Sequence, residues 1–537
     1  MASFTFSPLT PTAFLTRSAA VFADRVAVVD GERRFTYAEF ADRAQRLAGA
    51  LVGLGVQPGD RVAALCANSS AMLELHNGVP WAGAVLVPLN SRLSGEELEY
   101  ILGHAGASVL VADAAFADVA AKVAASVGIR LVVANGSGDS TNGNSGDDYE
   151  QLLDGASPLA RDCPDETGLL ALNYTSGTTG RPKGVMYHHR GAYLQALAMA
   201  LHSGMGPGSH YLWTLPMFHC DGWCYPWAVT AAGATHVCLP KVDPTVIWGL
   251  LRDEGITHYS AAPTVLNMIA SAKEAESGPL PQKVQVQTGG APPTPTLLSR
   301  MSDLNMNVTH LYGLTETYGP AMINQWRPEW DDLPGDQQAD LKSRQGVGNV
   351  VADRARVVAD DGSDVPADGQ TIGEISLRGN DVMLGYYEDQ AATDEATVTG
   401  TGEQAGLGWF RTGDLGVVHP DGYVEIRDRS KDIIISGGEN ISSVEVERAL
   451  DAHPSVLESA VVAEPHEKWG EVPVAHVTLR EGAEVTDEEL AAHVRERLAP
   501  FKVPKVFHYG ELPKTSTGKV QKKELRARAQ QGSGSSS

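Results

Sequence analysis

The chain has 537 residues, of which 43% are apolar and 20% are charged, a balance typical of globular proteins and not of disordered chains. One hydrophobic core rarely extends over this length, so we expect two to four structural units. The net charge of −24 and the pI of about 5.0 argue against nucleic acid or an anionic membrane as a partner.

The cysteine pattern bears on the cellular compartment. An odd number without a CxxC pair favours reduced thiols and therefore a cytoplasmic protein. No run of about eighteen apolar residues occurs, so we expect no stable membrane insertion. The N-terminus predicts a docking helix, and a transit peptide stays open as an alternative. The five cysteines are Cys66, Cys163, Cys220, Cys224 and Cys238.

The N-terminal half predicts strands that alternate with helices. A strand–turn–strand unit at residues 26–37 leads into an amphipathic helix that ends near residue 55. Residues 135–148 contain no apolar side chain and predict a solvated connector. This alternation favours a parallel α/β sheet, in which ligands bind beyond the carboxyl ends of the strands. The other elements expected are helices at 69–81, 93–104 and 190–201, and strands at 61–66, 85–88, 108–112, 169–172, 211–215, 235–239, 257–260, 284–287 and 308–312.

The pattern changes after residue 346. Short strands separated by Asp-Gly and Gly turns predict an antiparallel, barrel-like unit over the next eighty residues or so. After residue 432 a small α+β unit is expected, followed by a disordered tail that ends in GSGSSS. The expected elements are strands at 355–358, 373–377, 416–419, 423–426, 433–435, 456–462 and 472–479, and helices at 443–452 and 487–498.

The stretch YTSGTTGRPKG, residues 174–184, carries the strongest chemical signal. It combines three glycines, four hydroxyl side chains, Arg181 and Lys183. Backbone N–H groups of a glycine-rich loop can converge on one point, and hydroxyls and a lysine then complete a cradle for phosphate oxygens. The spacing differs from the Walker A motif, and a flexible surface turn is the alternative interpretation.

Five motifs together resemble the adenylate-forming superfamily, which contains acyl-CoA synthetases, adenylation domains and luciferases. In chain order they are YTSGTTGRPKG (174–184), YGLTET (312–317), GWFRTGD (408–414), DRSKDIIISGGENIS (428–442) and PKTSTGK (513–519). The stretch WTLPMFHCDGW (213–223) is most similar to ligases of short- and medium-chain or aromatic acids. The likeness spans nearly the whole chain.

This resemblance implies a fold. We expect an α/β protein whose large N-terminal domain, residues 1–428, has two stacked α/β subdomains and a β-barrel-like subdomain. A hinge at 429–432, with Lys431 at its centre, would join it to a small, mobile α+β domain at 433–528, and residues 529–537 would be a disordered tail.

The resemblance also implies a nucleotide site for ATP and Mg²⁺. Glu316 would bind the metal, and Lys519 would stabilise charge at the α-phosphate. Asp414 and Arg429 would hold the ribose, and glycines 437 and 438 would leave room for coenzyme A. The catalytic residues would be Lys519, His219, Thr175 and Glu316. The nucleotide and cofactor residues would be Thr175, Ser176, Gly177, Thr178, Thr179, Lys183, Gly290, Ala291, Pro292, Tyr312, Gly313, Thr315, Asp414, Arg429, Gly437 and Gly438.

The acyl group would lie in a pocket near the same motifs. Asp221 departs from the pattern, since relatives with this motif more often carry Asn there. A carboxylate near an acyl pocket is costly unless it is paired or wet, so Asp221 would recognise a polar substituent or reach solvent. The pocket residues would be His219, Asp221, Trp223, Thr288, Gly289, Gly313 and Tyr318.

The predicted reaction converts a small carboxylic acid to an acyl-AMP and then to an acyl-CoA. The same adenylation with a carrier protein, an amine or nitrite as acceptor is one alternative. A non-catalytic nucleotide-binding protein is another, which the intact set of motifs disfavours. Which acid is used stays open, and so does a homodimer.

Overall fold

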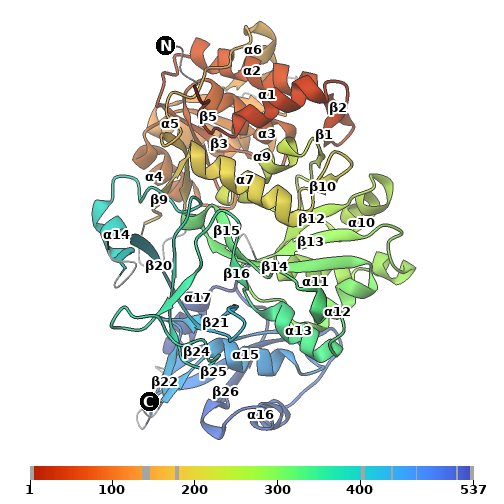
Figure 1. Cartoon of the computed structure of the whole chain (residues 1–537), viewed down its shortest axis with the longest axis vertical. Helices are drawn as coiled ribbons and strands as arrows, with labels where there is room; N and C mark the ends of the chain where they lie inside the picture. The colour runs from red at the N-terminus through yellow and green to blue at the C-terminus, as the bar shows by residue number, and fades with distance from the viewer. Residues whose placement is uncertain are drawn as a thin grey trace.

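The computed structural model describes residues 5–135, 146–175, 181–400, 406–436, 439–466, 469–515 and 518–532. Two α/β units form the upper and middle parts of the molecule in Figure 1, and the C-terminal unit, in blue, lies below them. No helix of these ranges is long and apolar enough to cross a membrane.

The first α/β unit is built on a mainly parallel sheet with the strand order β7-β6-β5-β3-β4-β8-β9. Its last pair, β8 and β9, is antiparallel and encloses the glycine-rich loop. The strands are β3 (Arg61–Leu65), β4 (Val85–Pro88), β5 (Ala107–Asp113), β6 (Arg130–Ala134), β7 (Asp147–Asp148), β8 (Leu169–Tyr174) and β9 (Gly184–His188). The helices are α1 (Thr12–Val21), α2 (Tyr37–Gly53), α3 (Ser70–Trp81), α4 (Gly95–Ala105), α5 (Ala117–Val127), α6 (Tyr149–Gly155) and α7 (His189–Ser203).

The second α/β unit has the strand order β16-β15-β14-β13-β12-β10-β11-β1-β2. Its central strands are parallel, and both ends of the sheet are antiparallel. The strands are β1 (Val26–Asp30), β2 (Arg33–Thr36), β10 (His210–Leu212), β11 (Thr235–Val237), β12 (His258–Ala261), β13 (Val284–Thr288), β14 (Met306–Leu314), β15 (Gly319–Ile323) and β16 (Val347–Gly348). The helices are α8 (Cys220–Trp223), α9 (Tyr225–Ala231), α10 (Pro244–Asp253), α11 (Pro263–Ser271), α12 (Pro295–Asp303) and α13 (Gly335–Ser343).

An antiparallel sheet follows, as the Asp-Gly turns predicted. The long strand β20 pairs with β18, β19 and β21. Its elements are β17 (Arg356–Val358), β18 (Gly373–Leu377), α14 (Gln390–Glu395), β19 (Thr397–Thr399), β20 (Gly408–Val418) and β21 (Val424–Arg429).

The C-terminal unit has its own sheet and its own apolar core, which supports the predicted separate α+β domain. Helix α17 continues to Gly532, so the predicted start of a disordered tail at residue 529 is too early. The elements are β22 (Ile434–Ser436), β23 (Glu439–Ile441), α15 (Ser443–Asp451), β24 (Val456–His466), β25 (Gly470–Leu479), α16 (Asp487–Arg495), β26 (Val506–Tyr509) and α17 (Lys522–Gly532).

Local sequence explains where several helices begin. The Thr36 hydroxyl accepts a hydrogen bond from the backbone N–H of Glu39, and the Glu39 carboxylate accepts one from the backbone N–H of Thr36. The same reciprocal capping box opens α4 at Ser94 and α16 at Thr486. Each box satisfies backbone donors that a helix start would otherwise leave unpaired.

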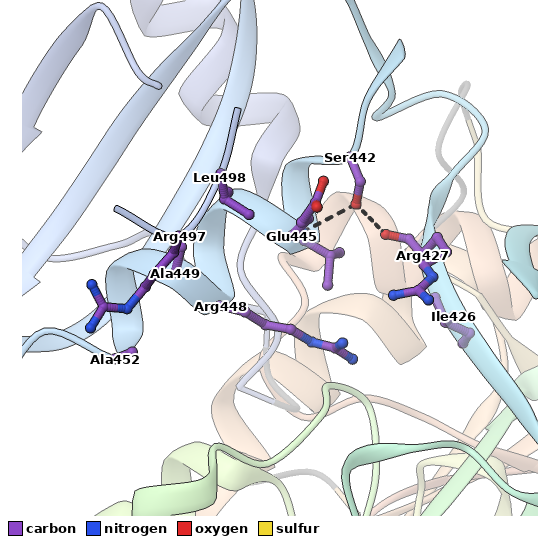
Figure 2. Close-up of a pocket in the computed structure, with 10 residues that line it drawn as sticks. Ile426, Arg427, Ser442, Glu445, Arg448, Ala449, Ala452, Arg497 and Leu498 are labelled. Carbon is purple, nitrogen blue, oxygen red and sulfur yellow. Dashed lines mark hydrogen bonds between the residues drawn. The ribbon is translucent and has the colours of Figure 1, made fainter. Parts of the chain in front are cut away.

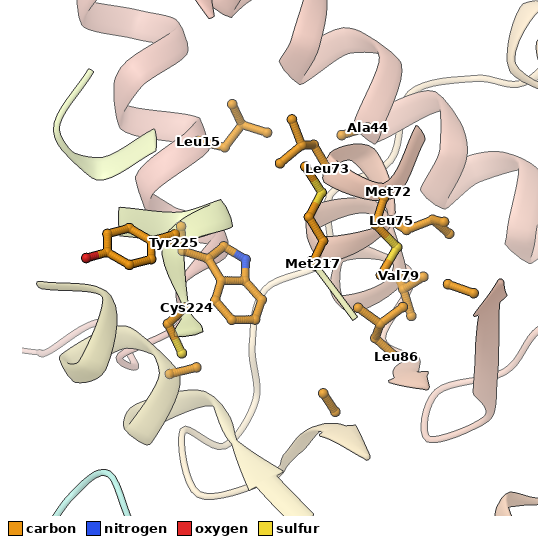
Figure 3. Close-up of a cluster of buried hydrophobic side chains, with 14 of the residues drawn as sticks. Leu15, Ala44, Met72, Leu73, Leu75, Val79, Leu86, Met217, Cys224 and Tyr225 are labelled. Atoms are coloured by element: carbon orange, nitrogen blue, oxygen red, sulfur yellow. The ribbon is translucent and has the colours of Figure 1, made fainter. Parts of the chain in front are cut away.

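Buried side chains of α3 form the centre of the largest core. Met72, Leu73 and Val79 belong to one core with Met217 and with Cys224 at the start of α9, and Leu73 lies beside Met217 (Figure 3). This core therefore joins the two α/β units, because α3 belongs to the first sheet and α9 packs beside the second.

Charged and polar groups connect the large domain to the C-terminal unit. Glu425 of β21 contacts Arg448 of α15 at 2.6 Å and His419 at 2.9 Å. Burial raises the pKa of Glu425, but the charges of Arg448 and Arg427 outweigh it and the pKa is lowered. A hollow lined by Arg427, Ser442 and Arg448 lies at this junction, and in it the Ser442 hydroxyl donates to the carbonyl of Arg427 (Figure 2).

Some predictions of local structure were wrong or incomplete. Helix α5 and strand β6 were missed, and so was β9, which stands between the glycine-rich loop and α7. The connector predicted at 135–148 ends in the short strand β7, and residues 136–145 lie outside the described ranges.

Two glycines of α2 provide a matched test of this packing. A Cβ atom on Gly49 would lie 2.0 Å from the carbonyl oxygen of Ser157, whereas one on Gly53 would meet nothing within 4 Å. We expect Gly49→Ala to destabilise the protein by about 1–3 kcal/mol through overpacking. Gly53→Ala should be neutral or slightly stabilising, because Ala favours helix. Thermal unfolding measures both, and equal Tm values for the two variants would contradict this packing.

Candidate active site

The glycine-rich loop lies between two antiparallel strands. Tyr174 of β8 is opposite Gly184 of β9, and the backbone N–H of Thr175 donates to the carbonyl of Lys183 at 3.0 Å. The Lys183 ammonium lies 4.9 Å from the ring centroid of Tyr386. The predicted phosphate ligands Ser176, Gly177, Thr178 and Thr179 lie outside the described residues. The ends of the loop are thus fixed by strand pairing.

Glu316 lies in a short 3₁₀ turn that follows β14. The Tyr386 hydroxyl donates to its carboxylate at 2.8 Å. Burial raises the pKa of Glu316, while the Tyr386 bond and the charges of Arg429 and Lys183 oppose this shift. One tyrosine therefore touches both the predicted metal ligand and the predicted phosphate lysine.

Asp414 joins two residues predicted to bind the nucleoside. It accepts a hydrogen bond from the Tyr312 hydroxyl at 2.6 Å and pairs with Arg429 Nε at 3.0 Å. Asp414 and Arg429 are direct partners in the β20–β21 hairpin. A carboxylate has about four acceptor positions, so Asp414 can still accept from a ribose diol.

Lys519 is carried by a tight loop of the C-terminal unit. The backbone N–H of Thr515 donates to the Lys519 carbonyl at 2.7 Å, and Lys514 and Val520 form an isolated antiparallel β-bridge. A Cβ atom on Gly518 would lie 2.3 Å from the Thr264 hydroxyl, which shows how closely this loop approaches the start of α11. Thr517 of the same motif lies outside the described residues.

The surroundings of Lys519 change its proton affinity. Loss of water, followed by the charge of Arg429, lowers the pKa of Lys519 to about 8, although Asp414 and Asp432 act in the opposite direction. Burial and the charge of Lys519 lower the pKa of His219 to about 4, so His219 is neutral at pH 7. The structure thus brings Lys519, His219, Asp414 and Arg429 into one electrostatic neighbourhood.

Trp223 lies against two glycines. A Cβ atom on Gly289 would be 3.1 Å from its ring, and one on Gly319 would be 2.6 Å from it. Thr288, which precedes Gly289, is fully buried, and its hydroxyl has no hydrogen-bond partner in the part of the chain described here. A buried hydroxyl without a partner is a candidate for a contact with a ligand.

The loop after β13 is open to solvent. Gly290 has φ +87° and nothing within 4 Å of a Cβ position, and both Gly290 and Ala291 are exposed. Pro292 is half-buried beside them. By contrast, a Cβ on Gly313 would lie 1.8 Å from the carbonyl oxygen of Gly319, so only glycine fits where β14 and β15 meet.

Asp221 and Tyr318 make contacts that the sequence did not reveal. Asp221 is fully buried and accepts a hydrogen bond from Asn173 at 2.9 Å. Of the two alternatives predicted for it, contact with solvent was therefore wrong. Tyr318 stacks on Tyr187 at 3.9 Å, and its hydroxyl accepts from the His188 N–H. A substrate contact for either residue stays a prediction.

The remaining predicted positions lie around this centre. Lys431 is exposed in the turn between β21 and β22, as a hinge residue would be, and Gly437 and Gly438 lie outside the described residues. The Thr315 carbonyl accepts from the Tyr187 hydroxyl at 2.6 Å. Motif reading missed Tyr386 and Thr264, because each contacts the site through a segment distant in sequence.

The comparisons identify the family. Residues 15–387 match the AMP-binding enzyme family, and residues 445–519 match the AMP-binding enzyme C-terminal domain. The chain belongs to the AMP-binding enzyme family. The resemblance to adenylate-forming enzymes is thereby confirmed.

Relatives within this AMP-binding family match over almost their full length. The chain is 44% identical to a peroxisomal acetate/butyrate–CoA ligase of Arabidopsis thaliana, with 98% of the chain and 95% of the relative covered. It is 42% identical to a 4-hydroxybutyrate–CoA ligase of Metallosphaera sedula, with the same coverage. The crystal structure of ATP-bound MatB from Rhodopseudomonas palustris superposes with a TM-score of 0.82 at 29% identity, covering 96% and 98% of the two chains.

The pKa of Lys519 predicts how the first half-reaction depends on pH. A lysine whose pKa is lowered to about 8 is charged below pH 8 and loses its charge as the pH rises. The kcat/KM for ATP in acyl-AMP formation should therefore fall about tenfold per pH unit above pH 8. Pyrophosphate release between pH 6.5 and 10 measures it.

Lys519→Arg is the matched control for this profile. Arginine stays charged throughout the range, so its residual activity should lose the decline above pH 8. A wild-type kcat/KM that stays level up to pH 9.5 would contradict the assignment of Lys519.

Proposed function

We propose that the protein is an AMP-forming acid–thiol ligase. It activates a small carboxylic acid with ATP to an acyl-adenylate and then transfers the acyl group to coenzyme A. The observation that carries this proposal is the meeting of Lys519 with Asp414, Arg429 and His219 between the two domains. The two ligases compared above are named as CoA ligases, in support of the same reaction.

The first half-reaction joins two anions. A carboxylate oxygen attacks the α-phosphorus of ATP, and the bond to pyrophosphate breaks with its electron pair leaving on pyrophosphate. Catalysis then consists mainly of neutralising charge and positioning the reactants. Lys519 would stabilise the charge at the α-phosphate, Lys183 and Thr175 would hold the leaving phosphates, and Asp414 with Arg429 would bind the ribose. His219, neutral at pH 7, would lie beside the acyl carboxylate without adding charge.

Magnesium fits this donor set through one carboxylate. No group of three or more His, Cys, Asp or Glu side chains that could hold a metal occurs within the described ranges. Mg²⁺ is usually bound by one or two carboxylates together with substrate phosphates and water. Glu316 would supply that carboxylate, and bound Mg²⁺ would neutralise the negative charge of the phosphates.

The second half-reaction replaces AMP by a thiol. The coenzyme A sulfur attacks the acyl carbonyl carbon, the carbon–oxygen bond to AMP breaks, and the thiol proton is released. We propose that the C-terminal unit turns about Lys431 between the two steps, which withdraws Lys519 and brings the 436–439 loop to the acyl group. The tight contact of Gly518 with Thr264 supports the view that this structure represents the adenylation step.

The proposed substrates are short- and medium-chain acids, because the relatives compared above are named for acetate, butyrate and 4-hydroxybutyrate. The five cysteines form no disulfide, and the cytoplasm remains the proposed compartment, although the Arabidopsis relative is named as peroxisomal. No observation favours an amine, nitrite or a carrier protein as acceptor, and a homodimer stays untested.

A product assay tests the function directly. Purified protein is incubated with ATP, Mg²⁺ and single acids from acetate to octanoate, benzoate and cinnamate, with and without coenzyme A. We expect acyl-CoA only when coenzyme A is present, and the highest yield with short-chain acids. Lys519→Ala should abolish product from free acid. AMP release at the same rate with and without coenzyme A would contradict the assignment as an acid–thiol ligase.

The role of Glu316 predicts a change in the metal requirement. Glu316→Gln keeps the size of the side chain and removes its charge, so the Mg²⁺ concentration for half-maximal activity should rise about tenfold or more. Glu329→Gln, at an exposed glutamate, is the control and should leave it unchanged. An unchanged requirement in Glu316→Gln would show that the metal is held elsewhere.

A further inference from the structure

The segment after His219 has an unusual backbone. Five successive residues have left-handed φ angles, and only one of them is glycine. Each other residue costs roughly 1–2 kcal/mol in this conformation, which persists only where the surrounding structure imposes it. We call residues 220–224 the left-handed turn. Its φ angles are 50° at Cys220, 47° at Asp221, 57° at Gly222, 56° at Trp223 and 62° at Cys224.

Asp221 ties this turn to two other elements. Its carboxylate accepts a hydrogen bond from the side-chain amide nitrogen of Asn173 at 2.9 Å, and its backbone N–H donates to the side-chain Oδ1 of Asn173 at 3.3 Å. Its other carboxylate oxygen, Oδ1, lies 3.4 Å from Nε2 of His76. Asn173 comes from β8 and His76 from α3, and all three side chains are almost completely buried.

The second ring nitrogen of His76 faces Asp221. Nδ1 of His76 lies 2.7 Å from the carbonyl of Met72, so Nδ1 must be the donor there. Nε2 and Asp221 Oδ1 face each other, and neither has another hydrogen bond in the described chain. Each of these two buried atoms therefore has the other as its nearest polar partner, so the contact offsets part of the cost of burying them.

The turn carries the residue that would wall the acyl pocket. The ring of Trp223 lies against Gly289 and Gly319, whose missing side chains make the space for it. Asp221 is two residues from Trp223 and two from His219, so a shift of the turn moves both. Figure 3 shows that apolar side chains of α3 also face this region, near Cys224 and Met217.

We propose that Asp221, His76 and Asn173 form a positioning clamp that fixes the left-handed turn and so sets how deep an acyl chain can enter beside Trp223. This inference rests on the proposed function, because it names the determinant of acid size in the same site. In this proposal Asp221 acts on the acid through the position of Trp223. The clamp explains why an acidic side chain is tolerated at position 221, since Asn173 and His76 give the buried carboxylate polar partners.

Two substitutions of Asp221 separate the clamp from simple packing. In Asp221→Asn, the amide can still accept from Asn173 and can donate to neutral His76, so the KM for the acid and the chain-length profile should stay close to wild type. In Asp221→Ala, both partners lose their bonds. The KM for the acid should rise about tenfold or more, and activity on longer acids should increase relative to short ones. The KM for ATP should stay unchanged.

Tyr149→Phe, in α6, is the matched control, because its hydroxyl bonds to the same helix that carries His76. It removes the hydrogen bond from the Tyr149 hydroxyl to Glu74 of α3, a buried contact away from the turn. It should lower Tm without changing the acid profile. If Asp221→Ala does not fold, His76→Leu combined with Asp221→Asn breaks the same contact without leaving a buried charge. This double variant should then show the increased activity on longer acids.

Hydrogen exchange of the 217–228 peptide gives a readout that does not need activity. Exchange should speed up in Asp221→Ala and stay at the wild-type rate in Asp221→Asn. A folded Asp221→Ala with wild-type exchange and acid profile would overturn the clamp. So would an Asp221→Asn that behaves like the alanine variant. Wild-type protein inactive on every acid would contradict the proposed function alone, and exchange would still decide the clamp.

Discussion

A cation that has lost much of its water lies where the C-terminal unit meets the large domain. Loss of water and the charges of Arg429 and Lys431 lower the pKa of Lys519, and Asp414 and Asp432 oppose this shift. Such a balance holds only while the two domains are in contact. Glu425 pairs with Arg448 across the same junction and so adds to the contact between the large domain and the C-terminal unit.

The acyl side of the site depends on a different constraint. The backbone at 220–224 has a conformation that its side chains do not favour, and buried polar contacts and the core around α3 hold it there. A rigid turn can place Trp223 against Gly289 with little freedom. Size selection among acids requires that rigidity, because a pocket wall that relaxes accepts longer chains at little cost.

Much of the site could be predicted because its motifs are local. The residues Lys519, Asp414 and Glu316 were named from short sequences, and the structure places them near one another or near shared partners. The Asp414–Arg429 pair could not be found by counting register back from the β20–β21 turn, because a bulge between Leu415 and Gly416 shifts the register by one residue. Tyr386 could not be found in this way, since its contacts with Glu316 and Lys183 join segments far apart in sequence.

The amino-acid sequence alone determined the family, the order of the units and the type of chemistry, because phosphate, metal and ribose each require particular side chains at short spacings. Only the tertiary structure decided the environment of each group. Asp221 shows the difference: its sequence position predicted contact with substrate or solvent, but packing places it against His76 and Asn173. Burial and polar contacts depend on which distant segments meet, and no local pattern encodes that.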